Sequence, residues 1–483
     1  MCGLQRKDLL RRQAWIGGAW IDADAGGRLP VFDPASGERL AEVPDLGRAE
    51  TARAIAAAEA AWPDWRARLA GERAACLRRW HDGMLAHADD LARLITLEQG
   101  KPLAEARGEI IYAAGFLAWF AEEAKRVYGQ VIPSPWLNRL VLTLKQPIGV
   151  AALITPWNFP AAMLTRKAGA ALAAGCTVVA KPASKTPLTA LALGVLAEEA
   201  GFPPGTINLV TGDAETIGAE LVANPAVRKL SFTGSTETGK RLMAACAGTL
   251  KRVSLELGGN APFIVFDDAD LEAAVEGALV SKYRNAGQTC VCANRLMAQS
   301  GIHDTFVARL AEAVSDLRVG HGLTPDVRQG PLVNEAAVAR VETRIAEAVA
   351  GGARVVCGGR RHALGGHFFQ PTVLADVRPE MRVCSEETFG PVAPVLRFET
   401  EAEAIALANA TEYGLAAYFY ARDMARIWRV AEALEYGMVG VNAGVISTEV
   451  APFGGVKQSG LGRGGGAEGI EDYLETKYLC LAE

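Results

Sequence analysis

The sequence predicts an α/β protein built on parallel sheets, and three observations support this class. Short apolar runs rich in β-branched residues, such as "CTVVAKP" and "PFIVF", recur between 149 and 266. Segments with helical spacing of apolar residues separate these runs. A second region with the same alternation extends from about 268 to 450. Strands that are apolar throughout are buried on both faces, so we expect helices on both sides of each sheet.

These patterns place the elements along the chain. The segment 48–126 is helical, with a break expected at Pro63 because proline lacks the backbone N–H. The first alternating region holds predicted strands at 149–155, 176–182, 207–212, 229–235, 253–259 and 262–266, and helices at 161–174, 187–200 and 214–223. The second holds helices near 268–284, 303–317, 334–350 and 401–410, and strands that include 354–359 and 438–442. Two further segments with strand character, 136–147 and 472–482, lie apart from both regions.

The bulk properties exclude several classes of protein. The chain has 483 residues, enough for roughly three structural units. Its formal net charge of −5 favours neither nucleic acid nor an anionic membrane as a partner. The N-terminal segment lacks the apolar core of a secretory signal, and no apolar run approaches the ~20 residues of a membrane span. The nine cysteines are scattered and odd in number, which is typical of reduced thiols, and we expect a cytoplasmic protein.

Two candidate contacts for a phosphorylated ligand follow strands of the first region. In "SFTGSTETGKRL" (231–242) a strand leads through Gly234 and Ser235 into a helix, whose N-terminal N–H groups suit a phosphate. In "VVAKPASKTP" (178–187) Lys181 ends a strand, and ligands of doubly wound sheets bind at the carboxyl ends of strands. Taken alone, an ordinary turn and a solvated lysine explain the same segments.

An acid lies within an otherwise apolar run in "LELGGN" (255–260). Burial of Glu256 is costly unless the carboxylate is paired or functional, and burial raises a carboxyl pKa toward that of a useful base. The alternative is a structural acid with a partner at the end of a strand.

The stretch "NAGQTCVCANR" (285–295) is compatible with a metal site, a disulfide or a nucleophile. Zinc needs about four ligands, and no histidine lies close in sequence to complete a set, so we expect no metal. A disulfide between Cys290 and Cys292 closes a strained, very small loop. A nucleophile at Cys290, after a glycine turn and with Glu256 to accept its proton, fits better. A plain structural cysteine is the remaining alternative.

Six motifs in this order resemble those of the aldehyde dehydrogenase superfamily: "PWNFP" (156–160), "FTGSTETG" (232–239), "LELGGN", "GQTCVCANR" (287–295), "EETFGPV" (386–392) and "PFGGVKQSGLGR" (452–463). The resemblance spans nearly the whole chain. It implies a Rossmann-like cofactor-binding domain (1–126 and 147–257), an α/β catalytic domain (258–455) and a small β-flap for oligomerisation (127–146 and 470–483). A homodimer or homotetramer is therefore expected.

The resemblance also implies roles for single residues. Cys290 matches the nucleophile and Glu256 the general base, and the Asn158 amide with the backbone N–H of Cys290 matches the oxyanion hole. The positions that match cofactor contacts are Trp157, Lys181, Ser184, Gly234 and Ser235 on the adenosine and phosphate side, and Leu257, Glu387 and Phe389 on the nicotinamide side. A member of the fold that has lost catalysis is the rival class, and retention of the catalytic set argues against it.

Position 184 discriminates between the two nicotinamide cofactors. Many NAD-preferring relatives carry an acid there, which binds the ribose hydroxyls and repels a 2′-phosphate. This chain has Ser184 between Lys181 and Lys185, and two cations attract a phosphate dianion. We therefore expect NADP to be preferred, with NAD tolerated.

Three residues specify the substrate class. Arg166, Arg284 and Ser447 together resemble the succinate-semialdehyde dehydrogenases of the superfamily. Two guanidinium groups at the wall of the substrate site favour an aldehyde with a distal carboxylate. Glutarate semialdehyde, one methylene longer, is the alternative, since a methylene decides only about 1–3 kcal/mol. An arginine that faces solvent or pairs with an acid is the structural alternative at either position.

Two positions raise further questions. Cys292 is a candidate redox partner for Cys290, with a small packed residue as the alternative. Gly464 stands where family members commonly have a glutamate that supports proton relay, and its presence puts the deacylation rate in doubt.

Overall fold

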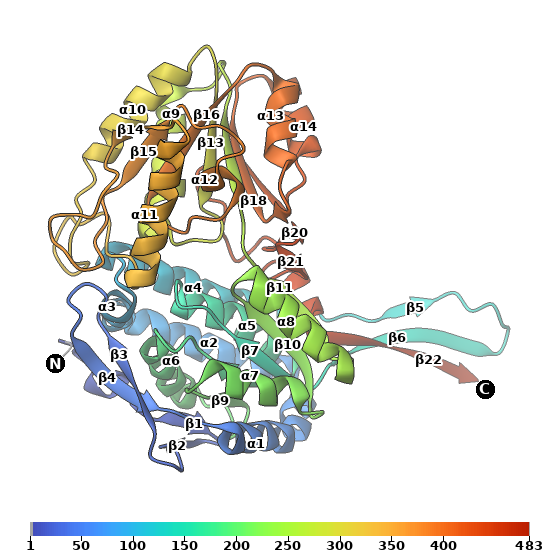
Figure 1. The fold of residues 1–483 in the computed structure, drawn as a ribbon. Helices are drawn as coiled ribbons and strands as arrows, with labels where there is room; N and C mark the ends of the chain where they lie inside the picture. Colours follow the sequence, from blue (N-terminus) through green and yellow to red (C-terminus); the bar gives the residue numbers. More distant parts are fainter. Residues whose placement is uncertain (1–2, 483) are drawn as a thin grey trace.

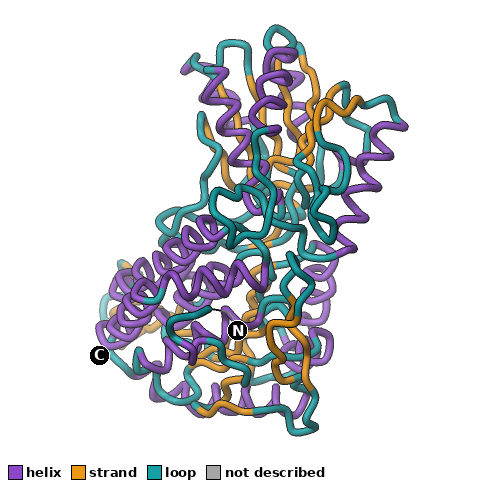
Figure 2. The backbone as a smooth tube through the Cα atoms, turned by 90° about the vertical axis from the view of Figure 1, so that its left-hand side faces the viewer, coloured by secondary structure: helices purple, strands orange, loops and turns teal. Residues whose placement is uncertain are grey.

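The computed structural model describes residues 3–482, so Cys2 lies outside the described residues. The described chain forms two lobes, each built around one large sheet, and a flap that projects from the lower lobe (Figure 1). Figure 2 shows the two lobes from the side, with loops between them.

The lower lobe holds a sheet of eight strands whose centre is parallel. Five of the six predicted strands of the first region make up this centre, and antiparallel strands extend it at both edges. The sixth, predicted at 262–266, belongs instead to the sheet of the upper lobe. One edge strand of the lower sheet comes from far along the chain. The order is β2 (Ala19–Ile21), β1 (Ala14–Ile16), β9 (Ile207–Leu209), β8 (Thr177–Lys181), β7 (Val150–Ile154), β10 (Val227–Thr233), β11 (Arg252–Glu256) and β21 (Gly460–Leu461).

Helices cover both faces of this sheet, as the apolar strands predict. Val150 and Ala152 of β7 belong to one buried cluster, and Ala151 and Leu153 to another, so alternate residues face opposite helical layers. The first cluster is covered by α1 (Arg48–Ala67), α7 (Ala214–Ala223) and α8 (Thr236–Cys246). The second is covered by α2 (Ala70–Ala86), α3 (Ala88–Gln99), α4 (Leu103–Glu123), α5 (Pro160–Ala174) and α6 (Pro187–Glu199).

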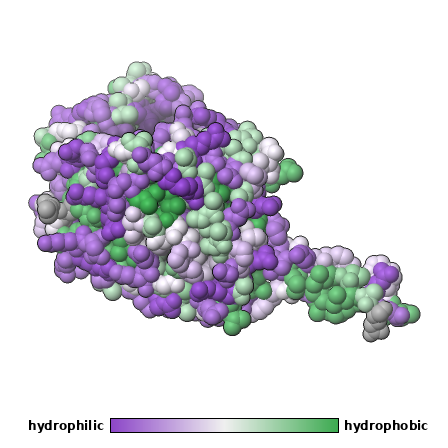
Figure 3. Space-filling view, turned by 90° about the horizontal axis from the view of Figure 1, so that it is seen from below, coloured by the Kyte–Doolittle hydropathy of each residue, from purple (hydrophilic) through white to green (hydrophobic). Residues whose placement is uncertain are grey.

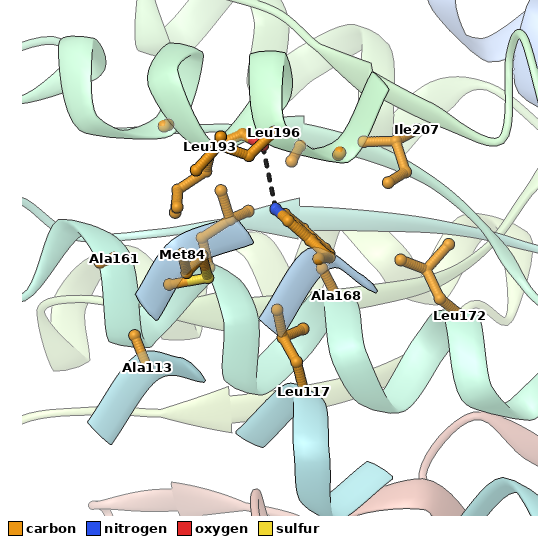
Figure 4. Close-up of a cluster of buried hydrophobic side chains, with 14 of the residues drawn as sticks. Met84, Ala113, Leu117, Ala161, Ala168, Leu172, Leu193, Leu196 and Ile207 are labelled. Atoms are coloured by element: carbon orange, nitrogen blue, oxygen red, sulfur yellow. Dashed lines mark hydrogen bonds between the residues drawn. The ribbon is translucent and has the colours of Figure 1, made fainter. Parts of the chain in front are cut away.

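The second cluster brings four helices together. Met84, Leu117, Leu172 and Leu193 come from α2, α4, α5 and α6 and converge in one apolar layer (Figure 4). The long segment before residue 126 is thereby fixed against the sheet that carries the candidate cofactor residues.

The predicted break at Pro63 is wrong, because α1 continues through it to Ala67. Pro63 is exposed, so the carbonyl that loses its N–H partner can be hydrated. Trp65 in the next turn is fully buried and anchors the end of the helix in the core.

The upper lobe holds a sheet of seven strands, parallel except at one edge. The order is β14 (Arg354–Cys357), β15 (Thr372–Ala375), β16 (Val392–Phe398), β13 (Ala293–Gln299), β12 (Ala261–Val265), β18 (Ala416–Tyr420) and β19 (Met438–Val441). One face packs on α9 (Leu271–Tyr283) and α10 (His303–Ser315). The other packs on α11 (Glu335–Ala350), α12 (Arg382–Ser385), α13 (Glu401–Asn409) and α14 (Met424–Ala433).

The two segments predicted to lie apart from both sheets form the flap. β22 (Leu474–Ala482) pairs antiparallel with β6 (Arg139–Pro147), which pairs with β5 (Gln130–Ile132). The flap carries exposed apolar side chains, and Figure 3 shows its apolar surface on the projecting arm. The remaining elements are short: β3 (Arg28–Phe32), β4 (Arg39–Pro44), β17 (Tyr413–Gly414), β20 (Val456–Lys457), α15 (Glu468–Glu471), and the 3₁₀ turns η1 (Lys7–Leu9), η2 (Ala124–Arg126), η3 (Ala247–Thr249) and η4 (Arg284–Gly287).

Candidate active site

The predicted cofactor residues of the lower lobe lie at the carboxyl ends of its parallel strands. Trp157 follows β7, Lys181 ends β8, Gly234 follows β10 and Leu257 follows β11. Ligands of doubly wound sheets bind at this edge. Gly239 allows α8 to pack closely there, because a Cβ at this position would lie 2.4 Å from the side chain of Leu257.

The donors at this edge suit a phosphorylated ligand. Lys181 Nζ donates to Ser184 Oγ at 2.9 Å, and Ser184 donates in turn to the carbonyl of Gly212. Lys185 Nζ has no hydrogen-bond or ion-pair partner within residues 3–482 and lies 5.8 Å from the centre of the Trp157 ring. Burial lowers the pKa of Lys181 to about 8, which favours an anionic partner. The donor set therefore fits a dinucleotide phosphate.

The predicted nicotinamide-side residues lie at the junction of the lobes. Glu387 accepts a hydrogen bond from the backbone N–H of Gly259 at 3.2 Å, and burial raises the pKa of Glu387 to about 7. The rings of Trp157 and Phe389 meet edge to face, with centres 5.7 Å apart. Phe389 has a positive φ of 52°, a conformation that residues other than glycine rarely adopt.

Cys290 lies on a sharply folded loop between α9 and β13. Asn285 and Ala286 have φ angles of 53° and 55°, which turn the chain back after α9. Gly287 follows with a φ of 72°, and a Cβ there would lie 2.2 Å from the carbonyl oxygen of Gly390. Only glycine fits this crossing, and the turn leaves Cys290 half-buried.

Cys290 lines a cavity of about 320 Å³, here called the front cavity. Residues of both lobes form its wall, and three predicted substrate residues are among them. The lining comprises Glu105, Gly108, Glu109, Tyr112, Phe159, Met163, Arg166, Arg284, Thr289, Cys290, Val291, Val445, Ser447 and Phe453. The structure thus brings Arg166, Arg284 and Ser447 together with the predicted nucleophile.

Several donors at the front cavity have no partner among the described residues. The guanidinium of Arg284 makes no hydrogen bond or ion pair and lies 5.6 Å from the centre of the Phe159 ring. The hydroxyl groups of Tyr112 and Thr289 are buried and unpaired. Unpaired buried donors are costly, and they converge on a cavity that can hold a polar ligand.

Arg166 is not free to face a ligand with its whole guanidinium. It is 1% exposed, and its Nη2 donates to Glu256 Oε2 at 2.5 Å. Thr233 Oγ1 donates to the same carboxylate oxygen at 2.6 Å, and Lys167 Nζ lies 3.5 Å away. Both alternatives considered for the sequence therefore occur at once, because Arg166 lines the cavity and also pairs with an acid.

The expectation that burial raises the pKa of Glu256 is wrong for this structure. Burial acts in that direction, but the charges of Arg166 and Lys167 outweigh it, and the pKa of Glu256 lies below its usual value. Burial raises the pKa of Cys290 to about 12. At neutral pH the ligand-free protein therefore holds a thiol at Cys290 and a carboxylate at Glu256.

Asn158 is fixed by a buried ion pair that the sequence analysis missed. Lys101 Nζ donates to the Asn158 carbonyl at 2.7 Å and to Glu109 at 2.6 Å, and Glu109 accepts the N–H of Ala161 at the start of α5. The Asn158 side chain donates to the carbonyl of Gln288 in the nucleophile loop at 3.0 Å. The only sequence signal was charged residues inside a helical segment that packs on the core.

One predicted oxyanion donor lies on the same loop. The backbone N–H of Cys290 has no acceptor among residues 3–482. Cys292 lies directly before β13 and is 7% exposed, with its Sγ 3.3 Å from Lys282 Nζ. Both cysteines are free thiols in this structure.

These features define an enzyme that places a cysteine in a cavity between two α/β lobes, with a dinucleotide edge beside it. Residues 20–479 match the model of the aldehyde dehydrogenase family, and the chain belongs to this family. The membership and the α/β fold predicted from the six motifs are confirmed, and the family implies NAD(P) as the cofactor.

Named proteins and solved structures are similar to this chain over nearly its full length. Glutarate-semialdehyde dehydrogenase of Pseudomonas aeruginosa is 64% identical over 480 residues, which cover 99% of each chain. Succinate-semialdehyde dehydrogenase [NADP(+)] of Escherichia coli is 63% identical over 478 residues, again 99% of each chain. A crystal structure described as an Escherichia coli NADP-dependent enzyme superposes with a TM-score of 0.99 at 62% identity, and covers 99% of this chain and 100% of that one.

No group of three or more histidine, cysteine, aspartate or glutamate side chains within residues 3–482 is arranged to hold a metal ion. Over the same residues, no helix combines the length and apolarity that a membrane crossing requires.

Proposed function

We propose that this protein oxidises succinate semialdehyde to succinate with NADP, and that glutarate semialdehyde is its alternative substrate. The observation that carries this proposal is the unpaired guanidinium of Arg284 in the cavity that also contains Cys290. A cation that makes no hydrogen bond or ion pair with residues 3–482, at the wall of a mainly apolar cavity, favours an aldehyde whose far end is a carboxylate, although the nearby charge of Glu105 acts against it. The hydroxyl groups of Ser447 and Tyr112 line the same space.

The first half of the reaction uses Cys290. Its thiol loses a proton to Glu256 and the sulfur attacks the aldehyde carbon, which turns the carbonyl oxygen into an oxyanion. The side-chain amide of Asn158 and the backbone N–H of Cys290 stabilise that oxyanion, and each such donor is worth about 3–4 kcal/mol. Bound NADP supplies the hydride acceptor. The residues that hold it are Trp157, Lys181, Ser184, Gly234, Ser235, Leu257, Glu387 and Phe389.

The second half releases the acid. The acyl group remains on the Cys290 sulfur as a thioester after oxidation. Glu256 accepts a proton from water as the water oxygen bonds to the acyl carbon, and the C–S bond breaks to return Cys290 and free the carboxylic acid.

The choice between the two semialdehydes rests on one methylene. The relatives include enzymes named for each substrate at nearly equal identity, 64% and 63%. One methylene contributes about 1–3 kcal/mol to discrimination, so we expect measurable turnover of both. Succinate semialdehyde is our first choice.

Replacing Arg284 by glutamine tests the carboxylate site. We expect kcat/KM for succinate semialdehyde to fall by about 10- to 100-fold, mainly through KM, because a charge-assisted hydrogen bond contributes about 1.5–3 kcal/mol. Butanal, which lacks the carboxylate, should be oxidised as in the wild type. Arg328→Gln is the matched control, since Arg328 is exposed and lines a neighbouring cavity. Equal losses of kcat/KM for both aldehydes in Arg284→Gln would show that Arg284 does not bind the substrate carboxylate.

The preference for NADP is supported by the absence of an acid at Ser184 and by the cations on either side. We expect Ser184→Glu to shift the ratio of NADP to NAD specificity constants by about 100-fold toward NAD, because the new carboxylate repels a 2′-phosphate. Ser184→Ala, which removes the hydroxyl without adding charge, should lower NADP use only slightly. Initial rates at varied concentrations of NADP and of NAD measure both variants, and an unchanged ratio in Ser184→Glu contradicts the proposal.

Cys292 is proposed as a redox partner of Cys290. Hydrogen peroxide oxidises the Cys290 thiolate to a sulfenic acid with release of hydroxide, and the Cys292 thiol then displaces water to form the disulfide. The contact between Cys292 and Lys282 at 3.3 Å has to open for this step.

We propose a homodimer or homotetramer assembled through the flap, in a cytoplasmic protein. Exposed apolar side chains on the flap support this, because a projecting apolar sheet is buried against another copy in a stable assembly. They are Val131, Ile132, Trp136, Leu137, Leu140, Leu144, Tyr478 and Leu481. The corresponding division is 1–126 with 147–257 for the cofactor, 258–455 for catalysis, and 127–146 with 470–483 for assembly.

A further inference from the structure

Arg166 separates two cavities. It lines the front cavity, which contains Cys290, and also a small cavity behind it, here called the rear cavity, of about 10 Å³. Glu256 lines the rear cavity together with Lys167, Gly464 and Tyr473, and it does not line the front cavity. In this structure the general base therefore lies behind the arginine, away from the space in which a substrate meets Cys290.

The pairing of Arg166 is incomplete. Its Nη2 donates to Glu256, while its Nε and Nη1 are buried without partners. A guanidinium offers a carboxylate two edges, Nε with Nη2 and Nη1 with Nη2, because the third side is blocked by the Cδ atom. Both edges include Nη2, which also donates to Met163 Sδ at 2.9 Å, so a ligand carboxylate that binds Arg166 with two parallel hydrogen bonds has to displace Glu256 or Met163 from it.

Gly464 makes room for the rear position of Glu256. A Cβ at this residue would lie 2.7 Å from Glu256 Oε1 and 3.0 Å from Arg166 Cδ. The glutamate that relatives commonly carry here would bring a side chain into that space. Its replacement by glycine in this chain therefore permits the ion pair between Arg166 and Glu256 to form as observed.

We propose that Arg166 is shared between the general base and the substrate. In the free protein it holds Glu256 behind the front cavity, and the distal carboxylate of a bound semialdehyde takes its Nη2 and releases Glu256 toward Cys290. Gly464 is a positioning residue that gives Glu256 its resting place. The inference rests on the proposed function, because the substrate's own carboxylate is the trigger.

The electrostatics of Glu256 agree with this exchange. The ionisable groups that face it are Arg166 and Lys167 on α5, Tyr112 on α4, Cys290, and Tyr473 after α15. Loss of Arg166 to another carboxylate leaves the burial of Glu256 less opposed, so its pKa rises and it becomes a stronger base. An aldehyde without the carboxylate leaves Glu256 held back, so both the attack by Cys290 and the hydrolysis of the thioester should be slow.

Stopped-flow measurement of reduced-cofactor formation tests the exchange, because it separates the first turnover from later hydrolysis. With wild-type enzyme and NADP, we expect saturating butanal to be slower than succinate semialdehyde by about tenfold or more in both the first turnover and the steady state, the effect of one charge-assisted hydrogen bond. In Gly464→Ala, the added methyl group displaces Glu256 from its resting place, so the steady rate with butanal should rise toward that with the semialdehyde. The acidic limb of the butanal rate–pH profile should move to higher pH in the same variant.

A second variant guards against a folding defect in Gly464→Ala. Thr233→Val removes the 2.6 Å hydrogen bond that holds Glu256 in the rear position. Like Gly464→Ala, it should reduce the gap in steady rate between butanal and succinate semialdehyde. Thr165→Val is its control, since Thr165 is buried on α5 next to Arg166 and bonds only the Ala162 carbonyl, at 3.5 Å. It should leave the gap unchanged.

Failure of this inference is distinct from failure of the proposed function. One outcome is that the semialdehydes have the higher kcat/KM while the thioester formed from butanal is hydrolysed as fast as theirs. In that case the sharing of Arg166 is wrong and the proposed function stands. An unchanged gap in both Gly464→Ala and Thr233→Val also overturns it. If butanal has the higher kcat/KM, the proposed function fails first.

Discussion

Replacing Cys290 by alanine is expected to abolish aldehyde oxidation, with a loss in kcat of about 10⁴-fold or more. Among the residues that line the front cavity, Cys290 is the only thiol, so no other sulfur in that lining can form the covalent adduct. Its pKa of about 12 in the ligand-free protein means that it depends on a base for activation. Initial rates of reduced-cofactor formation with succinate semialdehyde and NADP measure the loss.

Cys292→Ala is the matched control for this variant. Cys292 is buried two residues further on, beside Lys282, and does not line the front cavity. It should keep wild-type oxidation, while its inactivation by peroxide should be less reversible by a dithiol, because a sulfenic acid at Cys290 that no neighbouring thiol captures is oxidised further by peroxide to a sulfinic acid. Binding of NADP in Cys290→Ala should match the wild type and so exclude misfolding. Activity retained in Cys290→Ala and lost in Cys292→Ala would exchange the two assignments.

Replacing Glu256 by glutamine is expected to lower kcat by about 10³-fold, within the range of general-base catalysis. The amide can accept neither the Cys290 proton nor the proton of water, so acylation and hydrolysis should both slow, and the acyl group that forms should persist on Cys290. Intact-protein mass spectrometry after mixing with succinate semialdehyde and NADP should detect this adduct. In the wild type it should be scarce, because hydrolysis regenerates the thiol.

Glu220→Gln is a suitable control for the Glu256 variant. Glu220 is another buried glutamate, on α7, and it pairs with Arg48 away from the site. The same chemical change there should leave kcat unaltered. A Glu256→Gln enzyme that turns over at the wild-type rate would assign the base to another group.

Most of the fold was predictable because the strands of both sheets are apolar on both faces. The runs "VAALI" and "TVVAK" appear as β7 and β8 at nearly the predicted positions, since their burial leaves no other structure for them. The helix through Pro63 was not predictable, because its last turn is held by the burial of Trp65, a tertiary contact. The antiparallel edge strand β21 likewise depends on a partner about 200 residues away in sequence.

The site was predictable in its members but less so in their pairing. Family motifs placed Cys290, Arg166 and Arg284, and the structure lines one cavity with all three. The sequence carries no signal that Arg166 binds Glu256, because that pair joins α5 to the end of β11 across 90 residues. The pair formed by Lys101 and Glu109, which fixes Asn158, was missed for the same reason: its function depends on where α4 packs.

The specificity constants for four aldehydes test the central claim most directly. They are succinate semialdehyde, glutarate semialdehyde, butanal and betaine aldehyde, each measured with NADP and with NAD. We expect the two carboxylated aldehydes to exceed butanal by about 10- to 100-fold with NADP, through the pairing of their carboxylate with Arg284 and Arg166. Values for butanal or betaine aldehyde that equal or exceed those of the semialdehydes would contradict the carboxylate site.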